Sequence, residues 1–291
     1  MQEYSLTSLE FELFRKLIHK LTGISLNDGK RQLVQSRLQK RLRHLNLATF
    51  TEYYALVEKI GPNDSEYRPF VNCITTNKTD FFRESHHFEF VSTVIIPEMI
   101  EDLRRGRRDK KVRIWHAGCS TGEEPYTLAI TLAESALADG QWDIRQLASD
   151  IDTDVLKAAQ SGIYSEDKTE PIGSSLLRKY FLRRSTDGTC LYKVRPELAE
   201  QITFKCINLL EEHWPIGPKV QFDMIFCRNV VIYFDKSTQR RLFARFADLL
   251  RPGGYLFIGH SESLLGISDS FDSVGQTIYQ LAESVSSSRA A

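Results

Sequence analysis

The stretch WHAGCSTGEEPYTLAI, residues 115–130, joins an apolar run to a sequence with helical character. Gly118 and Gly122 are spaced as GxxxG, and a missing side chain allows a tight turn and close approach of a ligand to the backbone. Dinucleotide-binding sites use GxGxxG instead, and the following helix N-terminus holds a pyrophosphate. Glu123 and Glu124 would place negative charge against such a phosphate. The stretch therefore disfavours a phosphate ligand and favours a cationic one.

Around this stretch, apolar runs of strand length alternate with helical patterns, which predicts a mostly parallel sheet covered by helices. The predicted strands are VRIWHA (112–117), IRQLASD (144–150), ITFKCIN (202–208), FDMIFCRN (222–229), GYLFIGH (254–260) and QTIYQL (276–281). The predicted helices are 124–137, 154–160 and 239–250. Residues 165–205 interrupt the alternation and indicate a small inserted subdomain with a helix and a hairpin.

The N-terminal quarter of the chain has a different pattern. In residues 1–75 the apolar side chains recur at helical spacing, with breaks at Gly23, at Asn46 and at GPND (61–64), which predicts a small bundle of three or four helices. Residues 76–88 show neither period and form a predicted linker to an α/β domain at 89–281. The tail 282–291 is rich in serine and is predicted to be flexible.

Composition limits the kinds of partner. The 291 residues include 38 basic and 38 acidic side chains, so no overall charge draws the protein to nucleic acid or to a membrane. No run approaches the about 18 apolar residues of a membrane span, and the acidic N-terminus is unlike a secretory signal, so we expect a cytoplasmic protein without membrane insertion.

The five cysteines form no CxxC pair, and the adjacent His86 and His87 should point apart, so we expect no metal.

Asp150 ends the second predicted strand, within ASDID, where a carboxylate can accept both hydroxyl groups of a ribose. A positively charged nucleoside without phosphates describes S-adenosylmethionine (SAM), whose sulfonium and ammonium groups favour nearby carboxylates. The spacing does not decide whether Glu123 or Glu124 faces the ligand. The alternative is that the glycines only make turns and the glutamates are ordinary first-turn helix residues.

Six motifs occur in order along the chain: TTNKTDFFRE (75–84), STGEEPY (120–126), ASDID (148–152), INLLE (207–211), FDMIFCRNVVIYF (222–234) and GHSE (259–262). From about residue 10 to residue 280 the chain resembles the CheR family of chemotaxis receptor glutamate O-methyltransferases, and FCRNVVIYF is the most specific string. The resemblance implies a Rossmann-like SAM-dependent methyltransferase domain with an inserted antiparallel β-subdomain and a small all-helical N-terminal domain. It also implies transfer of the SAM methyl group to receptor glutamates, which forms methyl esters and S-adenosylhomocysteine (SAH) and adapts chemotactic signalling.

The resemblance also implies the residues of the site. The cofactor contacts would come from the linker and the strand ends: Asn77, Thr79, Arg83, Gly118, Glu124, Asp150, Asn208, Leu209, Arg228 and Asn229. Arg83, Arg228 and Tyr233 would be the catalytic residues that hold the acceptor carboxylate. We expect at least one of these arginines to be shared with the cofactor carboxylate or with Asp150. His116 and Cys119 stand where small residues are common in such sites, and we expect neither to be catalytic.

A basic helix is predicted within GKRQLVQSRLQKRLRHL (29–45), and no acidic residue occurs between Asp28 and Glu52. Its cationic residues, predicted to bind receptor, are Lys30, Arg31, Arg37, Lys40, Arg41 and Arg43. On a helical wheel, positions 30, 37, 41 and 44 face outward, opposite the leucines. A solvated face without a partner is the alternative. In the resembled family the partner is the cytoplasmic helical domain of methyl-accepting chemoreceptors, and the inserted hairpin in some members holds a receptor C-terminal tethering peptide, which stays open for this chain.

Two other functions compete with receptor methylation. A SAM-binding signalling module without turnover would bind SAH tightly but transfer no methyl group; the intact Arg83, Arg228 and Tyr233 argue against it. A nucleic-acid methyltransferase would use the basic helix to bind RNA or DNA. The neutral net charge and the lack of a recognisable nucleic-acid-binding module argue against this second function.

Overall fold

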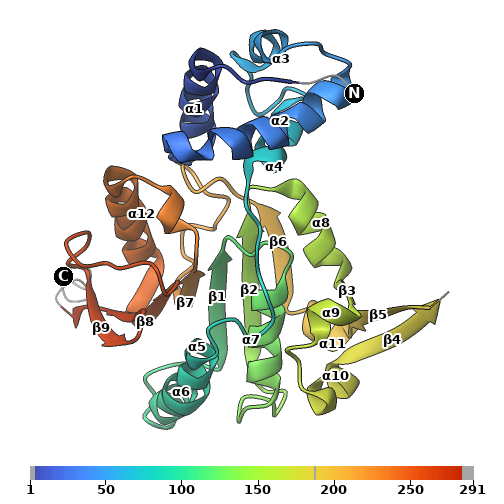
Figure 1. The fold of residues 1–291 in the computed structure, drawn as a ribbon. Coiled ribbons are helices and arrows are strands. Elements are labelled where there is room, and N and C mark those ends of the chain that lie inside the picture. The colour runs from blue at the N-terminus through green and yellow to red at the C-terminus, as the bar shows by residue number, and fades with distance from the viewer. Residues whose placement is uncertain (1–3, 187, 284–291) are drawn as a thin grey trace.

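A computed structural model describes residues 4–186 and 188–283 of the chain. These residues form a helical bundle, an α/β domain below it and a protruding β-hairpin to one side (Figure 1). Most of the tail that was predicted to be flexible, 282–291, lies outside the described residues. Within the described residues, no helix has both the length and the apolar character required to span a bilayer.

The helical bundle confirms the predicted all-helical N-terminal domain. Threonine side chains begin two of its helices in capping boxes, Thr7 with Glu10 and Thr49 with Glu52. Its centre is aromatic, because Phe14 packs against Phe50, Tyr53, Tyr54 and Phe70. The helices are α1 (Ser8–Thr22), α2 (Arg31–Leu45), α3 (Phe50–Val57) and α4 (Tyr67–Ile74), with a 3-10 turn, η1 (Asp28–Lys30), before α2.

The main sheet has the order β6-β2-β1-β7-β8-β10-β9 in the described residues. The first five strands of this order pair in parallel, and β10 and β9 add an antiparallel edge, so the predicted mostly parallel sheet is confirmed. The strands are β1 (Lys111–Ala117), β2 (Asp143–Asp150), β6 (Ile202–Cys206), β7 (Phe222–Cys227), β8 (Leu250–Ile258), β9 (Phe271–Gly275) and β10 (Ile278–Leu281). The short edge strand β9 was not predicted.

Helices cover both faces of this sheet. Trp115 and Ile225 share one apolar cluster with Phe246 of α12, whereas Ile114 shares another with Met99 of α6 and Leu128 of α7. The alternation along β1 explains this division, since successive side chains of a strand point to opposite faces. The covering elements are α5 (His86–Phe90), the π-helical turn η2 (Val91–Ile95), α6 (Ile96–Arg104), α7 (Glu123–Ala133), α8 (Thr153–Ser161) and α12 (Lys236–Leu249).

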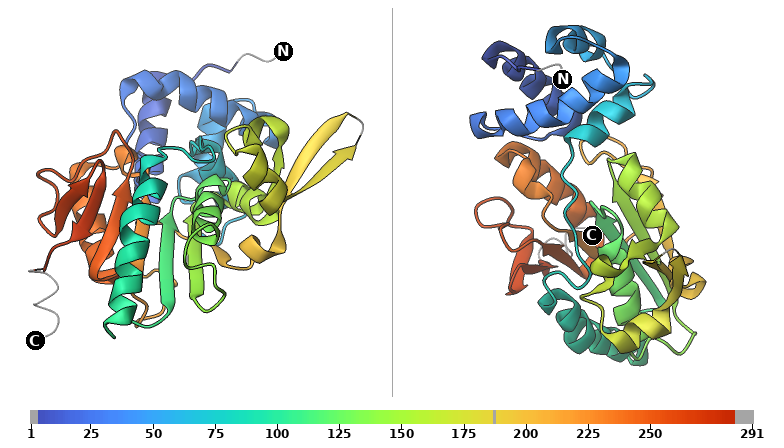
Figure 2. Two further views of the ribbon diagram at one scale, coloured as in Figure 1. Left: turned by 90° about the horizontal axis from the view of Figure 1, so that it is seen from below. Right: turned by 45° about the vertical axis from the view of Figure 1, so that its right-hand side comes forward.

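A small antiparallel sheet with the order β3-β5-β4 forms the inserted subdomain. Its hairpin extends away from the rest of the molecule (Figure 2). The predicted range of about 165–205 is wrong at its end, because Ile202–Cys206 is strand β6 of the main sheet and pairs with β2. The elements of the subdomain are β3 (Ile163–Ser165), α9 (Glu166–Thr169), α10 (Ser174–Tyr180), β4 (Phe181–Thr186), β5 (Thr189–Val194) and α11 (Pro196–Ala199).

Asp152 ties the linker to the sheet. Its Oδ1 accepts hydrogen bonds from the backbone N–H groups of Asp154 (2.9 Å) and Val155 (3.3 Å) and so caps α8. Its Oδ2 accepts from Thr75 Oγ1 at 2.6 Å and from Asn77 Nδ2 at 2.7 Å. One buried carboxylate therefore fixes both the start of a helix and the path of the linker that leaves the helical domain.

The helical domain also touches the α/β domain directly. The backbone N–H of Ser25 donates to the backbone oxygen of Tyr233 at 2.7 Å, and Asn208 Nδ2 donates to the backbone oxygen of Leu21 at 2.9 Å. These bonds hold the end of α1 and the loop that follows it above the carboxyl ends of the parallel strands. Ligand sites of open α/β sheets lie at that edge.

We predict that Asp152→Ala lowers the free energy of unfolding by about 2–3 kcal/mol, because a helix cap and a buried linker contact are lost together. Urea denaturation followed by circular dichroism measures the change. Asp272→Ala, at an exposed position on the edge strand β9, is the matched control and should change it by less than about 0.5 kcal/mol. Equal effects of the two substitutions would contradict this account of Asp152.

Candidate active site

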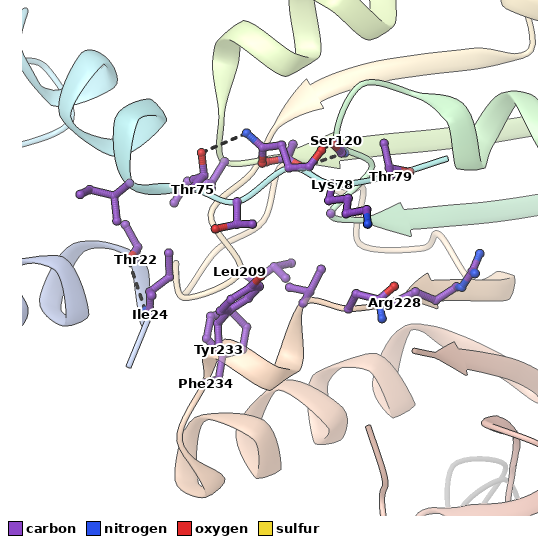
Figure 3. Close-up of a pocket in the computed structure, with 18 of the residues that line it drawn as sticks. Thr22, Ile24, Thr75, Lys78, Thr79, Ser120, Leu209, Arg228, Tyr233 and Phe234 are labelled. Atoms are coloured by element: carbon purple, nitrogen blue, oxygen red, sulfur yellow. Dashed lines mark hydrogen bonds between the residues drawn. The ribbon is translucent and has the colours of Figure 1, made fainter. Parts of the chain in front are cut away.

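A cavity of about 300 Å³, at the lower end of the range for small-molecule sites, lies between the strand ends and the helical domain. Its walls come from the loops after β1, β2, β6 and β7, from the linker, and from the loop between α1 and α2 (Figure 3). Every residue predicted to contact the cofactor or to be catalytic lines this cavity: Asn77, Thr79, Arg83, Gly118, Glu124, Asp150, Asn208, Leu209, Arg228, Asn229 and Tyr233.

The glycines of the opening motif have positive φ angles, +104° at Gly118 and +94° at Gly122. A Cβ at Gly118 would meet Val230 Cγ2 at 2.4 Å, and one at Gly122 would meet Ala159 Cβ at 2.9 Å. Backbone conformation and neighbouring side chains therefore require both glycines. The predicted tight turn is therefore present, and Gly118 lines the cavity with its backbone; close approach of a ligand to this backbone stays a prediction.

Glu124 faces the cavity and Glu123 does not, which settles the question that the spacing left open. Glu124 Oε1 lies 2.8 Å from His116 Nδ1, and its Oε2 accepts from Arg228 Nη1 at 3.1 Å. Burial opposes ionisation of this carboxyl, but the bond to His116 and the charge of Arg228 hold its pKa below the usual value. Glu123 instead accepts from Thr121 Oγ1 at 2.6 Å and is buried.

Arg228 is the centre of a buried ion cluster. Its side chain is only 3% exposed and pairs with Glu124 and, at 3.3 Å, with Glu84 Oε2. It also donates to the backbone oxygen of Arg83. Glu84 and Glu124 offset the cost of burying the charge of Arg228. The sharing of at least one arginine with the cofactor carboxylate or with Asp150 stays a prediction.

Glu84 is a site residue that the sequence analysis missed, although it ends the quoted motif TTNKTDFFRE. Its backbone φ is +57°, a conformation uncommon outside glycine. Burial raises its pKa, but Arg228 and a hydrogen bond from His260 Nδ1 at 2.9 Å outweigh this and lower the pKa to about 2. Glu84 therefore stays ionised and paired with Arg228.

Glu262, in GHSE, was also missed and holds the loop that follows β7. Its carboxylate accepts three backbone N–H bonds, from Asn229 (2.9 Å), Ile232 (3.1 Å) and Gly259 (2.5 Å). This loop continues as the 3-10 turn η3 (Val231–Tyr233) and carries Tyr233 to the cavity wall. Glu262 thus positions predicted site residues through their backbone.

Asn77 and Asn208 line the cavity, but their side chains bond to protein groups. The amide of Asn77 donates to Asp152, and that of Asn208 donates to the helical domain, so both residues shape the wall. Arg83 also bonds to a protein group, because its Nη1 donates to the backbone oxygen of Lys78 at 2.8 Å.

The basic helix differs from its predicted form. Arg31 donates to the backbone oxygen of Leu6, Arg37 to Thr76 Oγ1 at 2.9 Å, and Arg41 forms a half-buried pair with Glu66 at 2.7 Å. Arg31 and Arg41 therefore bond within the helical domain, and Arg37 bonds to the linker. Receptor binding by these three residues stays a prediction. The remaining basic residues of this helix lie in two different environments. Lys30, like Arg37, lines the cavity, whereas Lys40 and Arg43 are exposed on α2.

His86 and His87 do not point apart as expected, since their ring centroids are 4.2 Å apart. His87 Nε2 lies 2.9 Å from Thr277 Oγ1, and burial lowers the pKa of His87 to about 3. In the described part of the chain, no group of three or more His, Cys, Asp or Glu residues is arranged for a metal ion.

Comparison with known sequences agrees with this geometry. Residues 77–280 match the family description "CheR methyltransferase, SAM binding domain", and residues 9–75 match "CheR methyltransferase, all-alpha domain". The chain belongs to the CheR methyltransferase family. Its cofactor is therefore SAM, as predicted, and it is a SAM-dependent methyltransferase.

Relatives of this family align over nearly the whole chain. A protein named chemotaxis protein methyltransferase from Salmonella typhimurium is 43% identical over 284 residues, which is 97% of this chain and 93% of the relative. Chemotaxis protein methyltransferase 2 of Pseudomonas aeruginosa is 44% identical over 281 residues (97% and 96%). Chemotaxis protein methyltransferase of Escherichia coli is 42% identical over 284 residues (97% and 94%).

The cavity residues fit SAM. The largely buried carboxylate of Glu124 suits its ammonium group and the buried carboxylate of Asp150 suits its ribose, and Ile207 and Leu209 supply apolar surface for a base. Asp150 Oδ2 accepts from the backbone N–H of Ser120 at 2.8 Å, which fixes the carboxylate at the end of β2. When bound, SAM supplies an electrophilic methyl group.

We predict that binding of SAH weakens as the pH falls through about 6, because burial raises the pKa of Asp150 to about 6. Above that pH the carboxylate is ionised and can accept both ribose hydroxyls; below it, protonation competes with binding. The affinity should fall about tenfold between about pH 7 and about pH 5, which calorimetry can measure.

Asp150→Asn is the control for this prediction. The amide does not ionise, so the variant should bind SAH weakly and with a flat pH profile over the same range. A wild-type affinity that is constant between about pH 5 and about pH 7 would contradict the role given to Asp150.

Proposed function

We propose that this chain transfers the methyl group of SAM to glutamate side-chain carboxylates of chemoreceptors. The products are glutamate methyl esters and SAH, and the removal of negative charge shifts the signalling state of the receptor. The names of the aligned relatives, chemotaxis protein methyltransferases, support a role in chemotaxis.

The observation that carries the proposal is the distribution of charge along the cavity. Glu124 and Asp150 lie at the strand ends beside Arg228, whereas the helical domain and the linker supply Lys30, Arg37, Lys78 and Arg83 together with one acidic residue, Asp80. A cationic cofactor suits the first group and an anionic acceptor suits the second. This arrangement favours an acid side chain as acceptor.

Methyl transfer to a carboxylate needs no general base. A glutamate carboxyl has a pKa of about 4.3 and is ionised at neutral pH. One carboxylate oxygen forms a bond to the methyl carbon as the carbon–sulfur bond breaks, and that electron pair stays on sulfur. The task of the protein is to hold the carboxylate about 3–3.5 Å from the methyl carbon, in line with the sulfur, and to exclude water.

Arg83 and Tyr233 are the proposed holding groups. Both line the cavity, and Tyr233 is fixed through its backbone oxygen by Ser25 of the helical domain. Arg228 was predicted to share this task; its pair with Glu124 favours a place on the cofactor side. One guanidinium and one hydroxyl, rather than two guanidinium groups, would hold the acceptor carboxylate loosely enough to leave its oxygen nucleophilic.

Two surfaces support receptor binding. Lys40 and Arg43 leave a positive face on α2 for an acidic helical bundle, where complementary charge raises the rate of association. On the inserted subdomain, β4 is the outer strand of the β3-β5-β4 sheet, and an extended receptor peptide could add to it as a further strand. Arg183 and Arg184, exposed on β4, would favour an acidic peptide.

We predict that incubation with radiolabelled SAM and receptor-containing membranes transfers label to a receptor-sized band, and that base releases it as methanol, because a glutamate methyl ester is alkali-labile. Label in RNA or DNA would favour the nucleic-acid methyltransferase. Binding of SAH without any transfer would favour the signalling module. Either result would refute receptor methylation.

We predict that Lys78→Glu lowers kcat/KM for the receptor about tenfold, because an acidic acceptor would meet a negative charge at the cavity wall. The affinity for SAH should stay within about twofold, and raised salt should narrow the difference from wild type. Initial rates of ester formation at two salt concentrations measure this.

Lys59→Glu is the matched control, since its side chain is 91% exposed at the end of α3 and the charge change is the same. It should leave kcat/KM nearly unchanged. A loss of SAH affinity in Lys78→Glu as large as the loss in kcat/KM would place Lys78 on the cofactor and contradict the acceptor role.

A further inference from the structure

His116 is a fully buried polar residue on β1 that the proposed reaction does not use. Its ring stacks on Phe226 of β7, with centroids 5.1 Å apart and planes at 23°. Nδ1 lies 2.8 Å from Glu124 Oε1, and Nε2 lies 2.9 Å from Gln146 Oε1 on β2. Neighbouring strands therefore fix the ring, and the ring reaches the cavity through Glu124.

Glu124 has both carboxylate oxygens occupied by donors from different strands. Oε1 faces His116 on β1, and Oε2 accepts from Arg228, directly after β7. The side chain of Glu124 cannot rotate without losing one of these bonds. Fixing a flexible glutamate before the ligand arrives removes an entropic cost from binding.

The hydrogen-bond pattern determines where the proton of His116 lies. A carboxylate only accepts hydrogen bonds, so Nδ1 must carry a proton to bond to Glu124. Gln146 Nε2 has no partner among the described residues. Rotating that amide would make it a donor to Nε2, which gives a neutral ring with its proton on Nδ1. In either orientation of Gln146, the bond from Nδ1 to Glu124 persists.

We propose that His116 is a positioning residue for cofactor binding: it donates from Nδ1 to Glu124 and holds that carboxylate toward the ammonium group of SAM. The inference rests on the proposed assignment of Glu124 to the cofactor, and it holds for any acceptor. Bonds of this kind from a buried imidazole to a carboxylate fix the orientation of both groups.

Two amide substitutions separate this role from simple core packing. In asparagine the amide nitrogen lies as many bonds from Cα as Nδ1 does, and in glutamine as many as Nε2 does. His116→Asn therefore keeps the donor to Glu124, whereas His116→Gln keeps only the contact with Gln146. A packing role would make the two substitutions similar.

We predict that His116→Gln and His116→Ala weaken SAH binding about tenfold, whereas His116→Asn stays within about threefold of wild type. Calorimetry measures the affinities, and thermal unfolding without ligand checks that each variant is folded. In turnover assays the loss should appear in KM for SAM with kcat nearly unchanged, as expected for binding that is uniform along the reaction. An Asn variant as weak as the Ala variant would overturn the proposal.

A ligand without the amino group gives a second, independent test. Wild type and His116→Ala should bind the deaminated analogue of SAH equally, since the ammonium group through which His116 acts is missing. An equal loss for SAH and for the analogue would overturn the proposal. So would nitrogen NMR of labelled histidine that finds Nδ1 without a proton. These binding tests use no acceptor, so a wrong receptor assignment would not change them.

Discussion

The site depends on one buried arginine. Arg228 follows β7 with a side chain that is 3% exposed, and an isolated buried charge would be costly. Glu124 of α7 and Glu84 of the linker supply the compensating carboxylates, and they come from segments far apart in the sequence. The linker must therefore return to the strand ends, where it forms a wall of the cavity. The same ion pairs therefore stabilise the fold and shape the cavity.

A second carboxylate extends this constraint to the helical domain. Asp152 caps α8 and also binds the linker through Thr75 and Asn77. The bond from Ser25 to the backbone of Tyr233 then joins the helical domain to the cavity wall after β7. The helical domain is thus part of the site, and a receptor that binds it would act directly on the residues proposed to hold the acceptor.

Much of the fold follows from local sequence patterns, whereas the pairing of charges does not. The buried strand Phe222–Cys227 is apolar except for Asp223, so it was predictable, but the short edge strand β9 lacks such a run. A helical wheel places Arg41 toward solvent because it considers a single helix. In the structure Arg41 pairs with Glu66, which lies at the start of α4. Glu84 and Glu262 were within quoted motifs, yet their partners are set only by tertiary structure.

The changes in charge during the proposed reaction favour binding of the substrates and release of the products. SAM carries a net positive charge, and the acceptor carboxylate is negative, so each is attracted to its own end of the cavity. After transfer, SAH has lost the sulfonium charge and the ester has lost the carboxylate charge. Neither product is therefore held by the electrostatic attraction that drew its substrate into the cavity, whereas SAH keeps the proposed contacts to its ribose and its ammonium group. If Glu124 and Asp150 hold the ammonium group and the ribose as proposed, SAH keeps these contacts after transfer and should dissociate more slowly than the methylated side chain.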